Sequence, residues 1–284
     1  MARAAELLAG RRAVVLTGAG ISTDSGIPDY RGEGSPRRSP MTYGEFCLAE
    51  QARVRYWARS FAAWPRMAGV APNAGHHALA AMERSGAVSG VITQNVDGLH
   101  RKAGSRTVVE LHGRLAQVAC LGCGSRFDRE WHQRRLAALN PAFDPTPLAL
   151  APDGDVDLGS VAGYRVASCP RCCGVLKPDV VFFGEAVPRD RVTRGFEMVD
   201  AAEALLIAGS SLTVLSGYRF ARHAHARGIP IVIVNRGSTR ADKLATLKLD
   251  AGCSETLGAL AGELDPAWFH DHVGSTGYVM TRPT

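Results

Sequence analysis

The sequence contains no long apolar run, and this absence excludes several classes of protein. The longest apolar run near the N-terminus, Ala13–Leu16, is far shorter than the ~18–20 residues of a membrane span and too short for a signal peptide. Hydrophobic residues make up 46% of the chain and charged residues 21%, with a mean hydropathy of −0.04. This balance excludes a polar disordered chain and a membrane-embedded one. We expect a globular cytoplasmic protein with no membrane partner.

Lysine is also scarce, and the basic residues form no cluster. Only Lys102, Lys177, Lys243 and Lys248 accompany the arginines among 33 basic residues. The net charge of +6 and the isoelectric point near 9.1 would suit an acidic partner. Because the positive charges are scattered along the sequence, we attribute the surplus to solubility and predict no direct nucleic-acid partner. The sequence predicts nothing about self-association.

Seven cysteines are an odd number, which in a chain without an export signal argues against a disulfide framework. Cys120 and Cys123 form one Cys-x-x-Cys pair, and Cys169 and Cys172 form a second. Two such pairs are typical of a tetrahedral four-thiolate zinc site, which is structural because it has no open position for water. A redox function needs one pair at a helix N-terminus and leaves the second pair unexplained. Cys173 is an alternative ligand, although the spacing favours Cys172.

Short apolar runs alternate with helix-compatible stretches, a pattern typical of a parallel α/β sheet. The predicted strands are Ala13–Thr17, Val91–Thr93, Val108–Leu111, Val180–Phe183, Leu205–Ala208 and Ile229–Val234. The predicted crossover helices are Asn73–Ser85, Arg189–Ala202, Val214–Arg227 and Ser254–Glu263. Two stretches interrupt the alternation, a Gly- and Pro-rich segment at Arg31–Pro40 and the cysteine-bearing segment Cys120–Cys173. We interpret both as insertions into the sheet domain.

A glycine-rich segment, Gly18–Gly26, directly follows the first predicted strand. Its glycines allow a tight turn in which backbone N–H groups approach a pyrophosphate, although ordinary turn chemistry explains them equally well. The spacing is not the dehydrogenase fingerprint, because the third glycine comes late and no acidic residue ends an evident second strand. The acid, aromatic and cation at Asp29, Tyr30 and Arg31 favour ligand binding over a structural loop.

Polar side chains also follow the second and third predicted strands. Gln94, Asn95 and Asp97 come at a strand end, where open parallel sheets bind ligands, and can hold ribose hydroxyls and a carboxamide. A polar turn that satisfies its own backbone is the alternative interpretation. His112 ends the third strand and is followed by a glycine, so it can act as a general base near neutral pH. A structural histidine is the alternative there.

The second half of the sequence repeats this arrangement. Val180–Phe183 offers an apolar wall or an edge for an extended peptide, with a plain core strand as the alternative. Gly209–Ser211 places glycine and hydroxyls at a strand end before a helix, and Asn235–Gly237 closes the last strand. We interpret these two segments as the adenosine side of a dinucleotide site.

In combination, these motifs resemble those of the sirtuins, which are NAD-dependent protein deacylases, over about residues 7–262. The resemblance rests on GAGISTDSGIPDYRG, TQNVDGLH, ELHG, the four cysteines, KPDVVFFGE, GSSLTV and VNRG. The chain resembles most the class II branch, which includes the mitochondrial sirtuin-four type, through YWARSF, LAPDGDVDL and SGYRF. The resemblance implies a Rossmann-like parallel sheet domain with a smaller zinc-binding and helical domain.

We predict a catalytic domain over residues 1–264, with a C-terminal tail at 265–284. The Rossmann-like part comprises about 1–31, 72–116 and 175–264. The small domain comprises two insertions, a helical one at about 32–71 and a zinc-binding one at about 117–174.

The resemblance also implies roles for individual residues. His112 would be the proton acceptor, with Asn95 and Asp97 beside it in the catalytic centre. Val181 and Phe182 would flank an acyl-lysine peptide that adds a strand in the cleft. The implied contacts to NAD are Gly18, Ala19, Gly20, Ser22, Thr23, Asp29, Tyr30, Arg31, Gln94, Asn95, Val96, Asp97, Gly209, Ser210, Ser211, Asn235, Arg236, Gly237 and Cys253, the last through its backbone.

The implied reaction transfers the acyl group of an acyl-lysine in a protein or peptide to ADP-ribose and releases nicotinamide. Two alternatives remain open from the sequence. One is a protein mono-ADP-ribosyltransferase that uses the same cofactor pocket. The other is a non-catalytic, zinc-bearing module that binds NAD.

Tyr56 and Arg59 are three residues apart on a predicted helix, so they share a face. Sirtuins that prefer acidic acyl groups resemble this chain in having a Tyr-x-x-Arg at a comparable place. We expect Arg59 to accept a carboxylate-bearing acyl chain, with a solvated arginine as the alternative.

Overall fold

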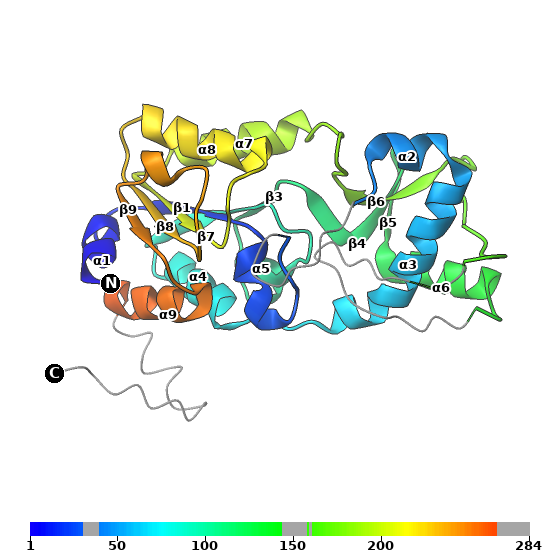
Figure 1. Ribbon diagram of the computed structural model, residues 1–284, viewed down its shortest axis with the longest axis horizontal. Coiled ribbons are helices and arrows are strands. Elements are labelled where there is room, and N and C mark those ends of the chain that lie inside the picture. Colours follow the sequence, from blue (N-terminus) through cyan, green and yellow to red (C-terminus); the bar gives the residue numbers. More distant parts are fainter. Residues whose placement is uncertain (31–39, 144–157, 159–160, 266–284) are drawn as a thin grey trace, which may run out of the picture.

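A six-stranded parallel sheet forms the larger region of the molecule (Figure 1). The computed structural model describes residues 1–30, 40–143, 158 and 161–265. The strands lie in the order β3-β2-β1-β7-β8-β9, and every neighbouring pair is parallel. Their bounds are Ala13–Thr17 (β1), Val88–Thr93 (β2), Val108–Glu110 (β3), Ala204–Ala208 (β7), Ile231–Val234 (β8) and Leu247–Leu249 (β9). This arrangement confirms the predicted α/β class with a Rossmann-like sheet.

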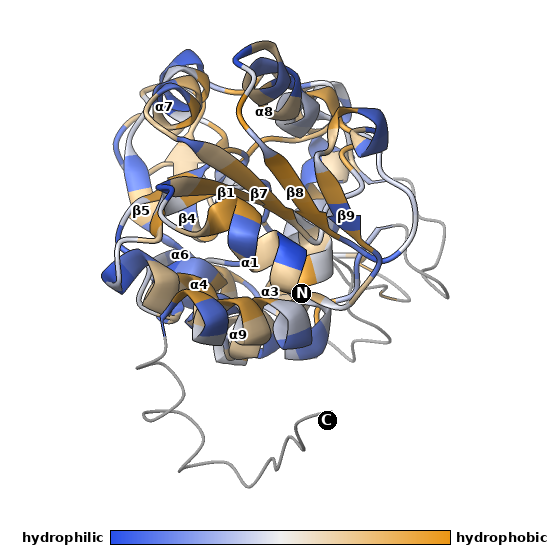
Figure 2. Ribbon diagram, turned by 90° about the vertical axis from the view of Figure 1, so that its left-hand side faces the viewer, coloured by the Kyte–Doolittle hydropathy of each residue, from blue (hydrophilic) through white to orange (hydrophobic). Residues whose placement is uncertain are grey.

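Helices cover both faces of this sheet because its central strands are apolar on both sides (Figure 2). In β1, Val14 and Leu16 pack toward one helix layer, whereas Ala13 and Val15 pack toward the other. One layer consists of α1 (Ala2–Leu8), α4 (Ala74–Arg84) and α9 (Cys253–Leu264), and the other of α7 (Arg189–Asp200) and α8 (Leu215–Ala226). Each layer therefore has its own apolar core against the sheet.

A smaller antiparallel sheet lies at the other end of the molecule (Figure 1). Its strands are β4 (Gly113–Cys120), β5 (Arg126–Asp128) and β6 (Leu176–Val180), with β4 in the middle, and its helices are α2 (Tyr43–Leu48), α3 (Glu50–Gly69) and α6 (Arg129–Leu139). They share a separate core that includes Phe46, Trp57, Val118 and Leu136. The helices that follow Pro40 and the described part of the cysteine-bearing segment thus belong to one smaller region, whereas residues 31–39 lie outside the described residues.

The prediction for Val180–Phe183 is wrong in two respects. The strand at this place, β6, spans Leu176–Val180, and it pairs antiparallel with β4 instead of joining the parallel sheet. An apolar run indicates burial, but it does not determine which sheet a strand joins. The sixth place in the parallel sheet belongs to β9, a half-buried Leu-Lys-Leu segment that is too short and too polar to stand out in the sequence.

The four predicted crossover helices are present as α4, α7, α8 and α9. Asn73 is the N-cap of α4, where its side chain accepts hydrogen bonds from the backbone N–H groups of Gly75 and His76. A short helix, α5 (Leu99–Lys102), follows β2. Among the described residues, no helix is both long and apolar enough to cross a membrane.

Candidate active site

A cavity of about 930 Å³ lies where the parallel strands end at their carboxyl termini. The segments after β1, β2, β7 and β8 form one side of it, and the segment after β6 forms another. Ligands of open α/β sheets bind at this edge. The predicted catalytic, cofactor and substrate residues line this cavity, except Thr23, Arg59 and Cys253. Arg31 lies outside the described residues.

The turn after β1 brings two backbone segments into contact. A Cβ added at Gly18 would lie 2.8 Å from Cβ of Ser210, and one at Gly20 would lie 3.0 Å from Cα of Gly209. The backbone N–H of Gly20 donates to the carbonyl oxygen of Gly209 at 2.8 Å. Only glycine permits this approach, which explains why the sequence has glycine at both strand ends.

Ser22, Asn95 and Asp97 form a hydrogen-bonded cluster on the cavity wall. Ser22 Oγ donates to Asp97 Oδ2 at 2.8 Å and accepts from Asn95 Nδ2 at 3.0 Å. The second carboxylate oxygen of Asp97 accepts from the backbone N–H of Leu99 at 2.9 Å. Burial raises the pKa of Asp97 above its ordinary value, and these hydrogen bonds act in the opposite direction. The cluster presents oriented amide, hydroxyl and carboxyl groups to a ligand.

Two buried histidines support this cluster from behind, and the sequence analysis did not single them out. His76 Nε2 lies 3.4 Å from Ser22 Oγ, and the rings of His76 and His100 are 4.9 Å apart. Burial lowers the pKa of both histidines, that of His76 to about 4, so both are neutral near neutral pH. The available signal was the position of His76 three residues after the N-cap Asn73, where it completes a capping box.

His112 lies between two hydrogen-bonding groups. Its Nδ1 is 2.8 Å from the carbonyl oxygen of Gln94, and its Nε2 is 2.8 Å from Ser216 Oγ. A carbonyl oxygen only accepts, so Nδ1 carries the proton of the neutral ring and Nε2 is the basic nitrogen. Burial and, to a smaller extent, the positive charges of Arg191 and Arg219 lower the pKa of His112 to about 4, although the hydrogen bond to Gln94 acts in the opposite direction. A neutral imidazole therefore lines the cavity.

The segments after β7 and β8 continue the cavity beyond Gln94. Gln94 Nε2 donates to Ser210 Oγ at 2.7 Å, and Asn235 Nδ2 donates to the carbonyl oxygen of Arg236 at 2.7 Å. Cys253 is buried and begins α9, and burial raises the pKa of its thiol to about 12. Its side chain is a neutral packing group, so only its backbone remains available for the predicted adenine contact.

Aromatic and aliphatic residues form the opposite side of the cavity. Val181 and Phe182 follow β6, and the Phe182 ring packs 5.2 Å from the ring of Tyr56. Arg59, one turn beyond Tyr56 on α3, is half-buried and does not line the described cavity. Of the LAPDGDVDL segment, only the final leucine lies within the described residues.

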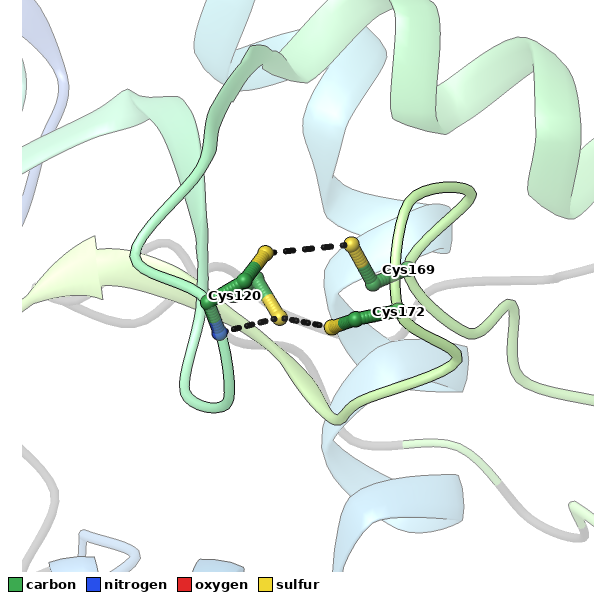
Figure 3. Close-up of side chains that lie close together, drawn as sticks. Cys120, Cys169 and Cys172 are labelled. Carbon is green, nitrogen blue, oxygen red and sulfur yellow. Dashed lines mark hydrogen bonds between the residues drawn. The ribbon is translucent and has the colours of Figure 1, made fainter.

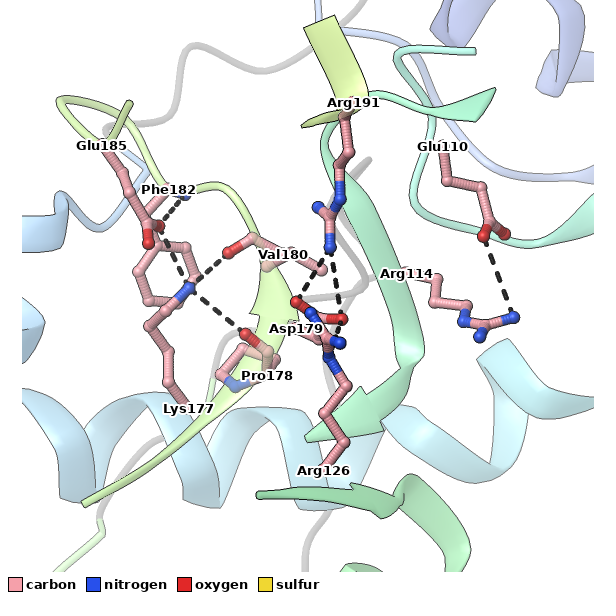
Figure 4. Close-up of polar contacts among 10 residues, drawn as sticks. All are labelled: Glu110, Arg114, Arg126, Lys177, Pro178, Asp179, Val180, Phe182, Glu185 and Arg191. Carbon is pink, nitrogen blue, oxygen red and sulfur yellow. Dashed lines mark hydrogen bonds and ion pairs between the residues drawn. The ribbon is translucent and has the colours of Figure 1, made fainter. Parts of the chain in front are cut away.

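Charged side chains hold the segment after β6 in place (Figure 4). Lys177 is 5% exposed and donates to the backbone carbonyls of Pro178 and Val180 in β6 and to Glu185 Oε2 at 3.0 Å, so it ties the segment after β6 to the strand. Asp179 forms ion pairs with Arg126 at 3.3 Å and with Arg191 at 3.1 Å. The sequence analysis treated Lys177, Asp179 and Glu185 only as parts of a strand motif, whereas they fix the position of the apolar wall.

The four predicted cysteine ligands converge on one point, and Figure 3 labels three of them, Cys120, Cys169 and Cys172. Their sulfur atoms lie within 4.8 Å of one another, with Cys120 Sγ 3.4 Å from Cys172 Sγ and Cys123 Sγ 3.8 Å from Cys169 Sγ. Zinc–sulfur bonds of ~2.3 Å in a tetrahedron separate the sulfurs by about 3.8 Å. The cluster therefore fits one structural zinc ion. Cys173 is exposed and is not part of the cluster, whereas Cys172 is, in agreement with the spacing in the sequence.

Comparison with known families identifies this arrangement. Residues 18–216 match the model of the Sir2 family. The chain belongs to the Sir2 family. It is 57% identical over 269 residues to NAD-dependent protein deacetylase 1 of Mycobacterium avium, with 93% of this chain and 95% of the relative covered.

Other relatives agree with this result. NAD-dependent protein deacylase Sirt4 of Drosophila melanogaster is 49% identical over 261 residues, covering 89% of this chain and 84% of the relative. A solved structure of Sir2 with a p53 peptide and NAD⁺ has a TM-score of 0.72 and 30% identity, and it covers 92% of this chain and 97% of that one. This Sir2 chain is thus an NAD-dependent protein deacetylase or deacylase, and its relatives include both bacterial deacetylases and the class II, sirtuin-four type.

Proposed function

We propose that His112 is the general base of the deacylation and that the cavity binds NAD and an acyl-lysine side chain together. The observation that carries this proposal is the state of the His112 ring. Its Nδ1–H is fixed by the Gln94 carbonyl, its Nε2 carries the basic lone pair of the neutral ring and lies 2.8 Å from Ser216 Oγ, and its pKa lies near 4. A base that is neutral at the working pH and lines the cavity is ready to accept a proton.

The residues around the cavity fit NAD. The close approach at Gly18 and Gly20 leaves the turn without side chains where a pyrophosphate would meet backbone N–H groups. Ala19, Ser22 and Thr23 would complete the phosphate turn, although Thr23 does not line the described cavity. When bound, NAD supplies an electrophilic ribose carbon with nicotinamide as its leaving group, together with ribose hydroxyls that receive the acyl group.

The oriented cluster of Ser22, Asn95 and Asp97 would hold the ribose and carboxamide of the cofactor. Its members hold one another through hydrogen bonds of 2.8 and 3.0 Å, so little ordering is needed on binding. Adjacent contacts would come from Gln94, Val96, Asp29, Tyr30 and Arg31, and adenosine contacts from Gly209, Ser210, Ser211, Asn235, Arg236, Gly237 and the backbone of Cys253.

An acyl-lysine peptide would lie against Val181 and Phe182 as an added strand. Val181 donates its backbone N–H to the carbonyl of His112, so the base and the apolar wall are joined through one backbone hydrogen bond of 2.8 Å. Solved relatives support this proposal, because one of them contains a p53 peptide together with NAD⁺.

The test is nicotinamide release and peptide deacylation by wild type and His112→Ala, with acetyl-, succinyl-, glutaryl- and lipoyl-lysine peptides. We expect peptide-dependent release, and we expect the substitution to reduce acyl transfer by about 10²–10⁴-fold while calorimetry still shows NAD binding. Wild-type acyl transfer by His112→Ala would contradict the role of His112. Label from NAD that stays on protein without an acyl peptide, and is insensitive to this substitution, would support ADP-ribosyl transfer.

We further propose that Arg59 selects carboxylate-bearing acyl chains from its place one turn beyond Tyr56. The test is the ratio of glutaryl- to acetyl-lysine turnover in wild type and Arg59→Ala, because a ratio cancels general effects on the base. Arg219→Ala is the matched control, since Arg219 does line the cavity. An unchanged ratio in Arg59→Ala would contradict the proposal, and a ratio that falls only in Arg219→Ala would assign the carboxylate to the α8 wall.

The domain boundaries and the compartment are proposals as well. The smaller region would comprise about residues 32–71 and 117–174 together with β6, which pairs with β4, and the sheet region the remainder of 1–264. Four clustered thiols that bind zinc suit a reducing compartment, so we propose a cytoplasmic location. Limited proteolysis with mass spectrometry and fractionation of the native host are the respective tests.

A further inference from the structure

Ser216 forms a hydrogen bond with the ring nitrogen through which His112 would act as a general base. It lies in the first turn of α8, is 7% exposed and lines the cavity. Its Oγ is 2.8 Å from His112 Nε2. Within the described part of the chain, this is the single hydrogen bond of the Ser216 side chain.

The direction of this hydrogen bond follows from the other side of the ring. Nδ1 donates to the Gln94 carbonyl, so Nε2 of the neutral ring has a lone pair and no proton. Ser216 therefore donates its hydroxyl proton to Nε2. The hydroxyl oxygen keeps two lone pairs, and no described group donates to them, so it can accept a proton from a further hydroxyl.

We propose that Ser216 is a proton relay between a ribose hydroxyl of the bound cofactor and His112. This inference rests on the proposed role of His112 as the base. The ribose O–H bond breaks as an O–H bond forms at Ser216 Oγ, while the original Ser216 O–H bond breaks and an N–H bond forms at His112 Nε2. Ser216 ends the step unchanged, the ring carries the positive charge, and the ribose oxygen is left as the nucleophile.

The charged groups around the His112 ring disfavour its protonated form, so the ring should release the proton that it receives. Arg191 and Arg219 face the ring with positive charges, and the Arg191 charge is compensated by Asp179 at 3.1 Å. Arg219 has no ion pair among the residues that the structure describes. An imidazolium is therefore unstable here, so the ring returns the proton in a later step.

The first test separates the relay from a structural role by comparing two reactions of the same complex. Exchange of labelled nicotinamide into NAD, in the presence of acyl peptide, does not need the base, whereas acyl transfer does. We expect Ser216→Ala to slow single-turnover acyl transfer by about 10-fold to 10²-fold while exchange continues. Ser216→Thr, which keeps a hydroxyl, should recover part of the rate.

The second test counts the protons in motion. A relay through Ser216 moves two protons together. In mixtures of H₂O and D₂O, a plot of the single-turnover rate of acyl transfer against the deuterium fraction of the solvent should therefore be curved. In Ser216→Ala the same plot should be a straight line. A straight line in wild type would overturn the relay.

A third readout needs no cofactor. In the free protein, NMR titration of the His112 ring should show a higher pKa in Ser216→Ala, because the hydroxyl that favours the neutral ring is gone. An unchanged titration together with wild-type acyl transfer would overturn the proposal. If His112→Ala also keeps acyl transfer, the proposed base itself is wrong; if His112→Ala abolishes transfer and Ser216→Ala does not, only the relay is wrong.

Discussion

The two regions of this sirtuin are stabilised in different ways. The sheet region has two apolar cores, one on each face of six parallel strands, and its helices bury residues such as Leu79 and Phe220 completely. The smaller region has a core around Trp57, and two of its buried members, Cys120 and Cys169, also belong to the four-cysteine cluster. The comparison indicates that the cavity wall formed by the parallel strands rests on apolar packing, whereas the wall after β6 belongs to the region that carries the four-cysteine cluster.

The largest expected effect, and the strongest test of this difference between the two regions, comes from removing one proposed zinc ligand. In Cys172→Ser we expect loss of bound zinc, and because structural zinc contributes about 10–16 kcal/mol, the smaller region should unfold. Deacylation should be lost with it. Hydrogen exchange should show that β4, β5 and β6 lose protection while the six-stranded sheet keeps it.

Cys173→Ser is the matched control, since Cys173 is the adjacent, exposed cysteine outside the cluster. It should keep zinc and activity. Equal zinc loss in both variants would contradict the ligand assignment, and loss of protection in both sheets would contradict the separation of the two regions.

A large-to-small substitution in the core of the sheet region tests the other half of the comparison, the contribution of apolar packing. Phe220 is fully buried on α8 and its ring packs 5.0 Å from that of Phe196. Phe220→Ala should lower the free energy of unfolding by about 3–5 kcal/mol in urea titrations, and zinc should stay bound in the native state. Leu215→Ala, at a side chain 60% exposed, should change it by less than about 0.5 kcal/mol. Similar losses in the two variants would be inconsistent with this core.

Acid should weaken both regions, because each contains buried histidines. Burial lowers the pKa of His76 to about 4 in the sheet region and that of His132 to about 3 in the smaller region. In the unfolded chain these histidines bind protons near pH 6.5, whereas in the folded protein they stay neutral down to about pH 4. Their protonation therefore lowers the free energy of unfolding between pH 6.5 and about 4. Stability should be constant above that window and fall by about 2 kcal/mol per histidine on acidification to pH 5.

Denaturant titrations at pH 7.5 and pH 5 measure this effect. His132→Gln should reduce the acid sensitivity of the smaller region alone, as followed by hydrogen exchange. Equal free energies of unfolding at the two pH values would show that these rings are not buried in the neutral form.

The ion pairs of Asp179 give a further comparison, between a half-buried link and an exposed one. Arg191, on α7, is 17% exposed and joins the sheet region to β6, whereas Arg126, on β5, is 62% exposed. Arg191→Ala should cost about 1.5–3 kcal/mol. Arg126→Ala should cost about 0–1 kcal/mol, because water screens an exposed pair. The reverse order in thermal or urea unfolding would contradict the view that Arg191 links the regions.

The sequence predicted those parts of the fold whose residues act locally. β1 has the predicted bounds because five successive apolar or small residues are buried on both sheet faces, and α4 follows its cap Asn73, the first residue of the predicted helix. The zinc cluster was predictable because a tetrahedral metal imposes a spacing on its ligands. The places of β6 and β9 in their sheets were not predictable, because the sheet that a strand joins depends on partner strands distant in the chain.

The same distinction applies to the site. Gln94, Asn95, Asp97 and His112 were predictable because they follow strand ends, where parallel sheets bind ligands. Ser216 was quoted only within a motif, and its contact with His112 spans 104 residues of sequence. No local pattern reports such a contact, since it depends on how the sheet places the start of α8, after β7, near the segment that follows β3.

The most direct test of the central claim is the protonation state of His112 in the free protein. Nitrogen-15 NMR of the histidine rings, with His112→Gln to assign the signal, reports which nitrogen carries the proton and where the ring titrates. The account predicts an Nδ1–H tautomer that stays neutral from pH 8 to about pH 5 and titrates near pH 4. An Nε2–H tautomer, or a midpoint near 6.5, would contradict it.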